Sequence, residues 1–372
     1  MNPFKYGCIV EGGYFCPRPQ LARQMEDYVA AGQNLVIQGE RRLGKSSLVT
    51  NTLRAMRGYH MLYADFMDVR TVADVCNQIA DGLARFEADD TLFKRTVTAL
   101  AHLRPTMSVD AMTGMPTLSI DAGAAQNPAS VNTMLNAVSD HVKGRKACVV
   151  FDEFQDILDL PEGSRILAIM RGKIQFMPET SFIFLGSARN AMLDIFMSPK
   201  SPFYKSATIF DVGLIPDDDF YRFISGRFKT GKRKISRDVF GRILDFASRT
   251  PGDVQEYCDA LWQVISEGNE ITDWTLNEAL SRIFARESDT FSSFTKRLTN
   301  LQLRVLRALA KLGGEHPLST DFMKEAGATN TASVKRALTA LCAAELVYRH
   351  GGEYKFVSPF FREWVRRRPV RG

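Results

Sequence analysis

The sequence lacks the features that define several classes of protein. No apolar run approaches the roughly 20 residues that a membrane-spanning helix needs. The six cysteines lie far apart and form no Cys-x-x-Cys pair, so we expect reduced core thiols rather than disulfides or a thiolate metal site. The first six residues do not have the charged and then apolar order of a secretory signal. We therefore expect a cytoplasmic protein with no membrane partner.

Composition is ordinary for a globular protein, but charge is unevenly distributed. The 372 residues are 45% hydrophobic and 24% charged, which is enough chain for two or three domains. From Phe291 to Gly372 there are 15 lysine and arginine residues against 6 acidic ones, which leaves 33 against 36 in the rest. A basic C-terminal segment indicates a polyanionic partner. The alternative is a solvated basic tail at residues 366–371.

A glycine-rich loop is the most informative motif. Residues 39–47 read Gly-Glu-Arg-Arg-Leu-Gly-Lys-Ser-Ser, a full match to G-x-x-x-x-G-K-[ST] between an apolar run and a helix-prone stretch. In such a loop the backbone N–H groups cradle phosphate oxygens, and the following helix adds its positive N-terminal end. The motif predicts a nucleotide cofactor, expected to be ATP. The predicted binding residues are Gly39, Glu40, Arg41, Arg42, Leu43, Gly44, Lys45, Ser46 and Ser47.

A second motif supplies the other half of the expected site. Residues 147–151 form an apolar run that ends in Asp152 and Glu153, the pattern of a buried strand with acidic residues at its end. Beside a phosphate loop, Asp152 and the Ser46 hydroxyl would hold Mg²⁺, while Lys45 would reach the β- and γ-phosphates. Glu153 would polarise the attacking water as a general base. The alternative is a strand that simply runs into a solvated loop.

A third apolar run, residues 181–186, ends in Ser187. We count Ser187 as a catalytic candidate because a polar residue at the end of a neighbouring strand can sense the γ-phosphate. The alternative is that its hydroxyl caps the helix that follows.

Alternating strand and helix patterns predict an α/β P-loop NTPase core at residues 1–215, with a mostly parallel sheet and helices on both faces. Two short strand patterns flank Thr113-Gly114 and predict a β-hairpin insertion at about 105–121. Residues 216–290 show only helical patterns, which predict an all-α lid.

The last block, residues 291–372, shows three helical patterns and then a hairpin pattern that turns at Gly351-Gly352. This order predicts a winged helix-turn-helix domain, in which the third helix can enter the major groove of double-stranded DNA. The predicted DNA contacts are Ser333, Lys335 and Arg336 on that helix and Arg349, His350 and Lys355 on the wing. The alternative is a winged helix that packs on protein.

Several short motifs together resemble the archaeal-type ATPases of archaea and many bacteria. They are Asn2-Pro-Phe, Phe15-x-x-Arg18, Gly39-x-Arg-Arg-x-Gly-Lys-Ser, Asp152-Glu-Phe-Gln155, Ser201-Pro-Phe-Tyr204 and the ending Ser358-Pro-Phe-Phe-Arg-Glu-Trp364. The family belongs to the STAND branch of P-loop NTPases, close to AAA+ proteins and origin-recognition ATPases. The resemblance implies an ATP-binding module, a helical lid, a C-terminal winged helix and slow, regulated hydrolysis. Specificity for adenine also comes from this resemblance.

Two positions depart from the family pattern. Lys205 stands where members often carry an arginine, and an ammonium cannot make the forked contact of a guanidinium. Gln255 stands at the arginine position of a lid segment that resembles the Gly-Asp-x-Arg sensor of origin-recognition proteins. Arg41, Arg42 or a partner subunit could supply the missing charge.

The sequence therefore predicts an ATPase whose Mg-ATP hydrolysis is coupled to DNA or to a DNA-bound partner. A nucleotide-gated binding switch, whose winged helix packs on protein, is the alternative. A small-molecule kinase is disfavoured by the adjacent Asp152-Glu153 pair and by the absence of an acceptor site. A protein partner or a second copy of the chain is a further expected partner.

Overall fold

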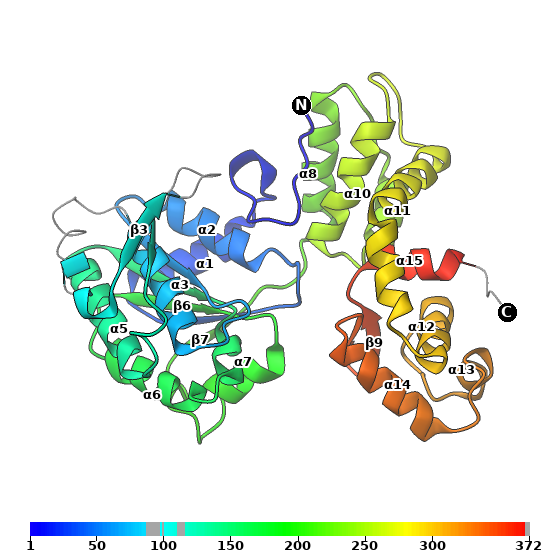
Figure 1. Cartoon of the computed structure of the whole chain (residues 1–372). Helices are drawn as coiled ribbons and strands as arrows, with labels where there is room; N and C mark the ends of the chain where they lie inside the picture. The colour runs from blue at the N-terminus through cyan, green and yellow to red at the C-terminus, as the bar shows by residue number, and fades with distance from the viewer. Residues whose placement is uncertain (87–96, 99, 110–115, 369–372) are drawn as a thin grey trace. The chain divides into compact units, whose positions relative to one another are not determined.

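A computed structural model describes residues 1–86, 97–98, 100–109 and 116–368 (Figure 1). The chain divides into two compact units, Cys8–Leu214 and a second made of Met1–Gly7 with Ile215–Gly372. The chain therefore crosses between the units twice, after Gly7 and after Leu214. No helix of the described ranges has the length and apolar character that a membrane span requires.

A parallel sheet forms the centre of the first unit. Among the described residues its strands are β1 (Leu35–Gln38), β2 (His60–Asp65), β5 (Ala147–Asp152), β6 (Ser181–Leu185) and β7 (Thr208–Asp211), in the order β2-β5-β6-β1-β7. The register places Asp65 beside Asp152. Because parallel strands end at the same edge, the loops that follow β1, β5 and β6 lie together there.

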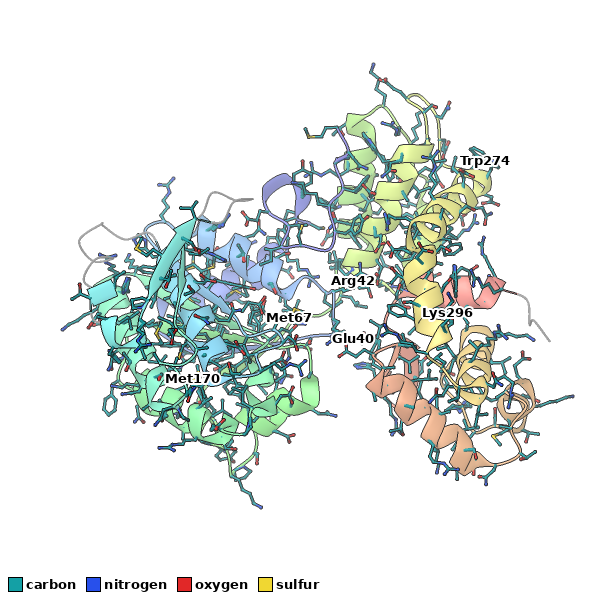
Figure 2. All side chains as sticks on the ribbon, in the orientation of Figure 1. Glu40, Arg42, Met67, Met170, Trp274 and Lys296 are labelled. Carbon is teal, nitrogen blue, oxygen red and sulfur yellow. The ribbon has the colours of Figure 1, made fainter. Side chains whose placement is uncertain are left out.

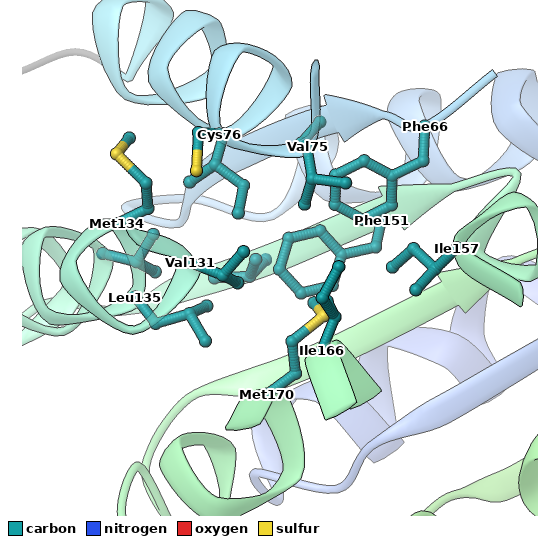
Figure 3. Close-up of a cluster of buried hydrophobic side chains, with 14 of the residues drawn as sticks. Phe66, Val75, Cys76, Val131, Met134, Leu135, Phe151, Ile157, Ile166 and Met170 are labelled. Atoms are coloured by element: carbon teal, nitrogen blue, oxygen red, sulfur yellow. The ribbon is translucent and has the colours of Figure 1, made fainter. Parts of the chain in front are cut away.

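Helices cover both faces of this sheet. One face packs against α3 (Val72–Arg85), α5 (Ala129–Val142), α6 (Gly163–Ile174) and α7 (Arg189–Phe196), and the other against α1 (Pro19–Ala30) and α2 (Lys45–Ala55). Each face of the sheet packs into its own hydrophobic core, and alternate residues of β5 belong to one core or the other. Phe151 lies in the core that contains Met170 (Figure 3), whereas Val150 lies in the core that contains Leu48. All of β5 is buried, as its continuous apolar run predicts. The predicted α/β P-loop fold is confirmed.

Two short pairings complete the first unit. The strands β3 (Thr106–Val109) and β4 (Pro116–Ser119) pair antiparallel, as the hairpin pattern predicts, while Thr113 and Gly114 lie outside the described residues. The edge strand β7 has no counterpart in the sequence analysis. It is only four residues long and buries Phe210 alone, so it carries no apolar run that could reveal it.

The second unit begins with a helical lid, made of α8 (Asp217–Thr230), α9 (Arg237–Phe246), α10 (Pro251–Val264) and α11 (Asp273–Lys296). The first seven residues of the chain pack on this lid. Asn2 Nδ2 donates a hydrogen bond to Asp259 Oδ1 at 2.6 Å, and the buried Phe4 ring lies 4.9 Å from Phe228. The assignment of residues 1–7 to the phosphate-loop core is therefore wrong, because their polar and aromatic partners belong to the lid.

The winged helix follows, with α12 (Asn300–Leu312), α13 (Thr320–Glu325), α14 (Thr331–Ala343), β8 (Val347–His350), β9 (Glu353–Phe356) and α15 (Pro359–Arg367). Asn330 Oδ1 caps α14 by accepting a hydrogen bond from Ala332 N at 2.7 Å. Gly351 and Gly352 both have positive φ, as a tight hairpin turn requires. The predicted winged helix is confirmed, and α15 is an additional helix.

The helix α11 runs without a break past the predicted boundary at 290–291. Figure 2 labels Trp274 near its first turn and Lys296 at its end. The first half packs against α10. In the second half, Phe291 lies 5.2 Å from Phe361 and 5.6 Å from Trp364, which both belong to α15. One helix therefore contributes to both the lid and the winged helix.

A second aromatic contact joins the same two parts. Phe360 of α15 is 1% exposed, and its ring centroid lies 5.4 Å from that of Phe246 and 6.0 Å from that of Tyr257 in the lid. The buried Arg362 also donates a hydrogen bond to Phe246 O at 3.0 Å. The lid and the winged helix therefore share one core.

We predict that Phe360→Ala destabilises the second unit by about 3–5 kcal/mol, because truncation leaves a cavity in this shared core. Denaturant unfolding of the full chain measures the change. Phe176→Ala is the matched control, because Phe176 is 79% exposed and its truncation should change the free energy of unfolding little. Equal effects of the two substitutions would contradict a shared core.

Candidate active site

The phosphate loop spans residues 39–44, between the end of β1 and the start of α2. Gly44 has φ +80°, a left-handed conformation that favours glycine. Gly39 is required for a different reason, since a Cβ there would lie only 3.0 Å from Val212 O. The N–H groups of Lys45, Ser46 and Ser47 open the helix and have no partner within it. The loop therefore presents backbone donors at a helix N-terminus, the arrangement that binds anions.

Lys45 lies folded over this loop. Its Nζ donates hydrogen bonds to Gly39 O at 2.9 Å and Glu40 O at 3.0 Å. Burial lowers the pKa of Lys45, while the nearby Glu153 and Asp152 carboxylates act in the opposite direction. A buried ammonium beside unpaired helix donors favours an anion at this position, which fits a phosphate group.

Asp152 collects donors from three elements. Its Oδ2 accepts hydrogen bonds from Ser46 Oγ at 2.6 Å and from the Tyr63 hydroxyl, and its Oδ1 accepts one from Glu153 N at 2.9 Å. Burial and the Asp152 charge both raise the pKa of Tyr63, so this phenol stays a neutral donor. A hydroxyl and a carboxylate in contact are the oxygen ligands that Mg²⁺ prefers, so Ser46 and Asp152 fit a magnesium site.

Glu153 is in contact with Ser187. Glu153 Oε2 accepts hydrogen bonds from Ser187 Oγ at 2.8 Å, from Ser187 N at 3.1 Å and from Gln155 Nε2 at 2.7 Å. Arg41 Nε lies 3.4 Å from the same Ser187 hydroxyl. The fold thus brings together an arginine of the loop, the end of β5 and the residue that follows β6.

The alternative that Ser187 caps a helix is wrong. The helix α7 begins at Arg189, its N-cap residue is Ala188, and no side chain caps it. The Ser187 hydroxyl instead points to Glu153.

Some predicted binding residues use their side chains elsewhere. Ser47 Oγ accepts a hydrogen bond from Val10 N at 3.1 Å, and Asn51 Nδ2 donates to Val10 O at 2.8 Å, so this face of α2 holds the N-terminal segment. The Leu43 side chain is buried. At Leu43 in the loop and Ser47 in α2, a ligand can therefore contact only the backbone.

Arg18 is a site residue that the sequence analysis treated only as part of a family motif. It is 7% exposed, and its guanidinium donates to Leu43 O and to Gly213 O, each at 2.8 Å. Burial lowers the pKa of Arg18. Because the C=O and N–H of a trans peptide point in opposite directions, holding the Leu43 carbonyl also orients the Gly44 N–H. Arg18 therefore positions the loop without being part of it.

Of the two departures from the family pattern, Lys205 belongs to the first unit and Gln255 to the second. Gln255 is buried within α10, and its amide oxygen accepts no hydrogen bond from the described residues. Lys205 is exposed, and its ammonium lies 5.3 Å from the centre of the Tyr204 ring. Within its own unit, neither residue forms the paired contact with an anion that an arginine could make.

The predicted DNA-contact residues lie on two elements of the winged helix. On α14, Lys335 and Arg336 are exposed and Ser333 is half-buried beside Arg336. On the wing, the Arg349 guanidinium carbon lies 5.8 Å from the centre of the Tyr354 ring, and His350 is half-buried. Lys355 Nζ lies 3.8 Å from Glu353 Oε2.

Two exposed arginines near the C-terminus pair with the buried Glu363. Glu363 accepts hydrogen bonds from Arg366 and Arg367 of the same helix at 2.7 Å. Although burial raises the pKa of Glu363, these two partners hold it below its ordinary value. Because both arginines are exposed, the solvated-tail alternative stays open for them, and Arg371 lies outside the described residues.

Comparisons with known proteins agree with this architecture. The model of a probable winged helix domain matches residues 289–367. The Walker-type ATPase PABY2304 of Pyrococcus abyssi is similar in structure, with a TM-score of 0.60 and 16% identity over 95% of this chain and 96% of that one. The Aeropyrum pernix ORC1 protein in complex with DNA is also similar, with a TM-score of 0.54 and 12% identity over 95% of this chain and 93% of that one. The A. pernix ORC2 protein has a TM-score of 0.50 and 14% identity over 93% of this chain and 90% of that one. No curated protein matches the sequence.

These neighbours share the fold of this chain, an α/β P-loop core followed by a helical region and a C-terminal winged helix. At these identities the likeness concerns the fold, and the chemistry must be argued from the residues described above.

We predict that Arg18→Met lowers the affinity for ATP by about tenfold or more, since a hydrogen bond from a charged group contributes about 1.5–3 kcal/mol. Arg18→Lys should recover part of the affinity, because an ammonium can hold one of the two carbonyls. Equilibrium binding of a fluorescent ATP analogue measures the effect. The control is Arg23→Met on the exposed face of α1. A lower melting temperature with unchanged ATP affinity would show that Arg18 only stabilises the fold.

Proposed function

We propose that this protein is an ATPase of the STAND type that couples Mg-ATP hydrolysis to double-stranded DNA, or to a DNA-bound partner, through its winged helix. The observation that carries the proposal is the convergence of Lys45, the Ser46–Asp152 pair and the Glu153–Ser187 pair beside the phosphate loop. Each group has the chemistry that one part of phosphoryl transfer to water requires.

The binding half of the reaction falls to the loop and α2. The backbone donors of residues 39–47 and the Lys45 ammonium would hold the β- and γ-phosphates, with Arg18 fixing the loop. Ser46 and Asp152 would hold Mg²⁺, which when bound neutralises phosphate charge. Tyr63 would keep Asp152 oriented by its hydrogen bond, as an outer-shell partner does for a metal ligand.

The hydrolytic half falls to Glu153. As a general base it must direct a carboxylate oxygen at a water, but here Ser187 and Gln155 hold its Oε2. A γ-phosphate that attracts the Ser187 hydroxyl and Arg41 would remove one of the three hydrogen bonds that this oxygen accepts. Slow, nucleotide-dependent turnover follows from that competition.

The same restraint supports a second candidate function, a nucleotide-gated switch that does not depend on turnover. Gln255 and Lys205 add to it, because neither supplies a guanidinium for the transition-state charge. A partner protein or a second copy of the chain would then provide the arginine, as an arginine in trans does in other phosphoryl-transfer systems.

The DNA partner is supported by the exposed cations of α14 and by the fold shared with an ORC1 protein whose structure contains DNA. The wing residues Arg349 and Lys355 would contact phosphates rather than bases. The adenine base is proposed only from the family resemblance, because no described group reads it.

We predict that Glu153→Gln lowers the hydrolysis rate by about 100- to 10,000-fold while ATP still binds, because a general base contributes a factor of this size. Lys45→Ala should weaken ATP binding itself. Phosphate release with and without duplex DNA measures turnover, and Glu179→Gln on the surface is the matched control. Wild-type protein that binds ATP but shows no turnover in either condition would favour the switch.

We also predict that the double variant Lys335→Ala/Arg336→Ala weakens binding to duplex DNA and lowers the salt dependence of binding by about two counter-ions. Fluorescence anisotropy at several salt concentrations measures both. Lys296→Ala/Arg297→Ala removes the same two charges from the end of α11 and its C-cap and serves as the control. Equal losses in both variants would exclude α14 as the recognition helix.

A further inference from the structure

A basic groove lies on the lid, where α8 turns toward α9. Residues 227–234 read Arg-Phe-Lys-Thr-Gly-Lys-Arg-Lys. A tight turn, in which Lys232 N donates to Lys229 O at 2.9 Å, gathers these cations at the end of α8. Four of these cations, all except Arg227, line a groove of about 440 Å³ together with one acidic residue. The lining residues are Tyr221, Ser225, Lys229, Lys232, Arg233, Lys234, Ile235 and Glu270.

The turn is held by specific contacts rather than left as a mobile loop. Arg233 Nε donates to Ile265 O at 2.8 Å, and its guanidinium lies 4.0 Å from the centre of the Trp262 ring. A Cβ at Gly231 would overlap that same ring, so only glycine allows the approach. Lys234 N donates to Asn269 O at 3.0 Å, which ties the turn to the segment that carries Glu270. The groove is therefore preorganised.

Its charge is not neutralised within the lid. Lys229 and Lys234 make no ion pair within the part of the chain that the structure describes. Lys232 pairs with Glu267 at 2.9 Å, but both side chains are exposed, and such surface pairs contribute only about 0–1 kcal/mol. An incoming anion can therefore recruit Lys232 at little cost. Glu270 is the one lining group that opposes an anion.

We propose that this groove binds phosphate groups of a nucleic-acid backbone, as a second contact beside the winged helix. Lysine ammonium groups bind phosphates as point charges without reading sequence, which suits a backbone contact. The proposal rests on the proposed DNA partner. Both contacts belong to the second unit, so binding at one raises the effective concentration of DNA at the other.

The test compares the full-length wild-type protein with the triple variant Lys229→Ala/Lys232→Ala/Lys234→Ala. Anisotropy with a labelled 30-base-pair duplex between about 50 and 200 mM salt gives the dependence of log affinity on log salt. The slope is negative, and we expect its magnitude to be smaller by about three in the triple variant. Each lost phosphate contact lowers that magnitude by about 0.9. Glu270→Gln should raise the affinity, since it removes the one acidic side chain that lines the groove.

Two controls isolate the groove. Lys143→Ala/Lys146→Ala/Lys200→Ala removes the same net charge from exposed positions of the first unit and should leave the slope unchanged. Unchanged ATP affinity and melting temperature in the triple variant show that it is folded. An unchanged slope in the triple variant, while the wild type and the α14 variant differ, overturns the groove and leaves the proposed function intact.

Other outcomes are equally decisive. No DNA binding by the wild type overturns both the groove and the proposed DNA partner. Calorimetry with inorganic phosphate provides the last arm: saturable binding that the triple variant loses, together with an unchanged DNA slope, would assign the groove to free phosphate. Loss of slope without any saturable binding of inorganic phosphate supports the nucleic-acid backbone.

Discussion

The parallel register of the central sheet is the constraint on which the rest of the candidate site depends. Only when β5 ends level with its neighbours does Asp152 reach the Ser46 hydroxyl at 2.6 Å and the Tyr63 phenol from β2. The same alignment brings Glu153 to Ser187 beyond β6. The register is fixed in turn by two apolar cores that bury alternate residues of every inner strand, so a slip of one residue would exchange the cores. The geometry of the candidate site therefore follows from the packing of the sheet.

The second unit is organised by aromatic packing instead. Phe291 and Phe360 connect the lid to the winged helix through rings on α15, and α11 contributes to both. A force on the lid helices is therefore carried to α14 by a packed core and not by a flexible linker. If nucleotide changes the position of the lid, the winged helix must follow, which gives a physical route from the candidate active site to the proposed DNA-binding helix.

Much of this could be predicted from the sequence, and the parts that could not have identifiable causes. The strands β1, β5 and β6, the hairpin and the winged helix carry strong periodic or apolar signals, and the loop motif is local. Arg18 was not recognised as a site residue because its partners, Leu43 and Gly213, are backbone carbonyls whose positions leave no trace in residue type. Residues 1–7 were assigned to the wrong unit because Phe4 packs across a sequence separation of more than two hundred residues. The short edge strand β7 had too few buried residues to show a pattern.

The double crossing of the chain has a mechanical consequence. The units are joined after Gly7 and again after Leu214, so two covalent tethers connect them rather than one. Two connections leave fewer relative arrangements open to the units than one connection would, because each closes a loop of chain. On one side of the first tether Phe4 is anchored in the lid, and on the other Val10 is anchored to Ser47 on α2. The N-terminal segment is thus a second covalent connection, and a cut in either one would leave the two units linked by the other.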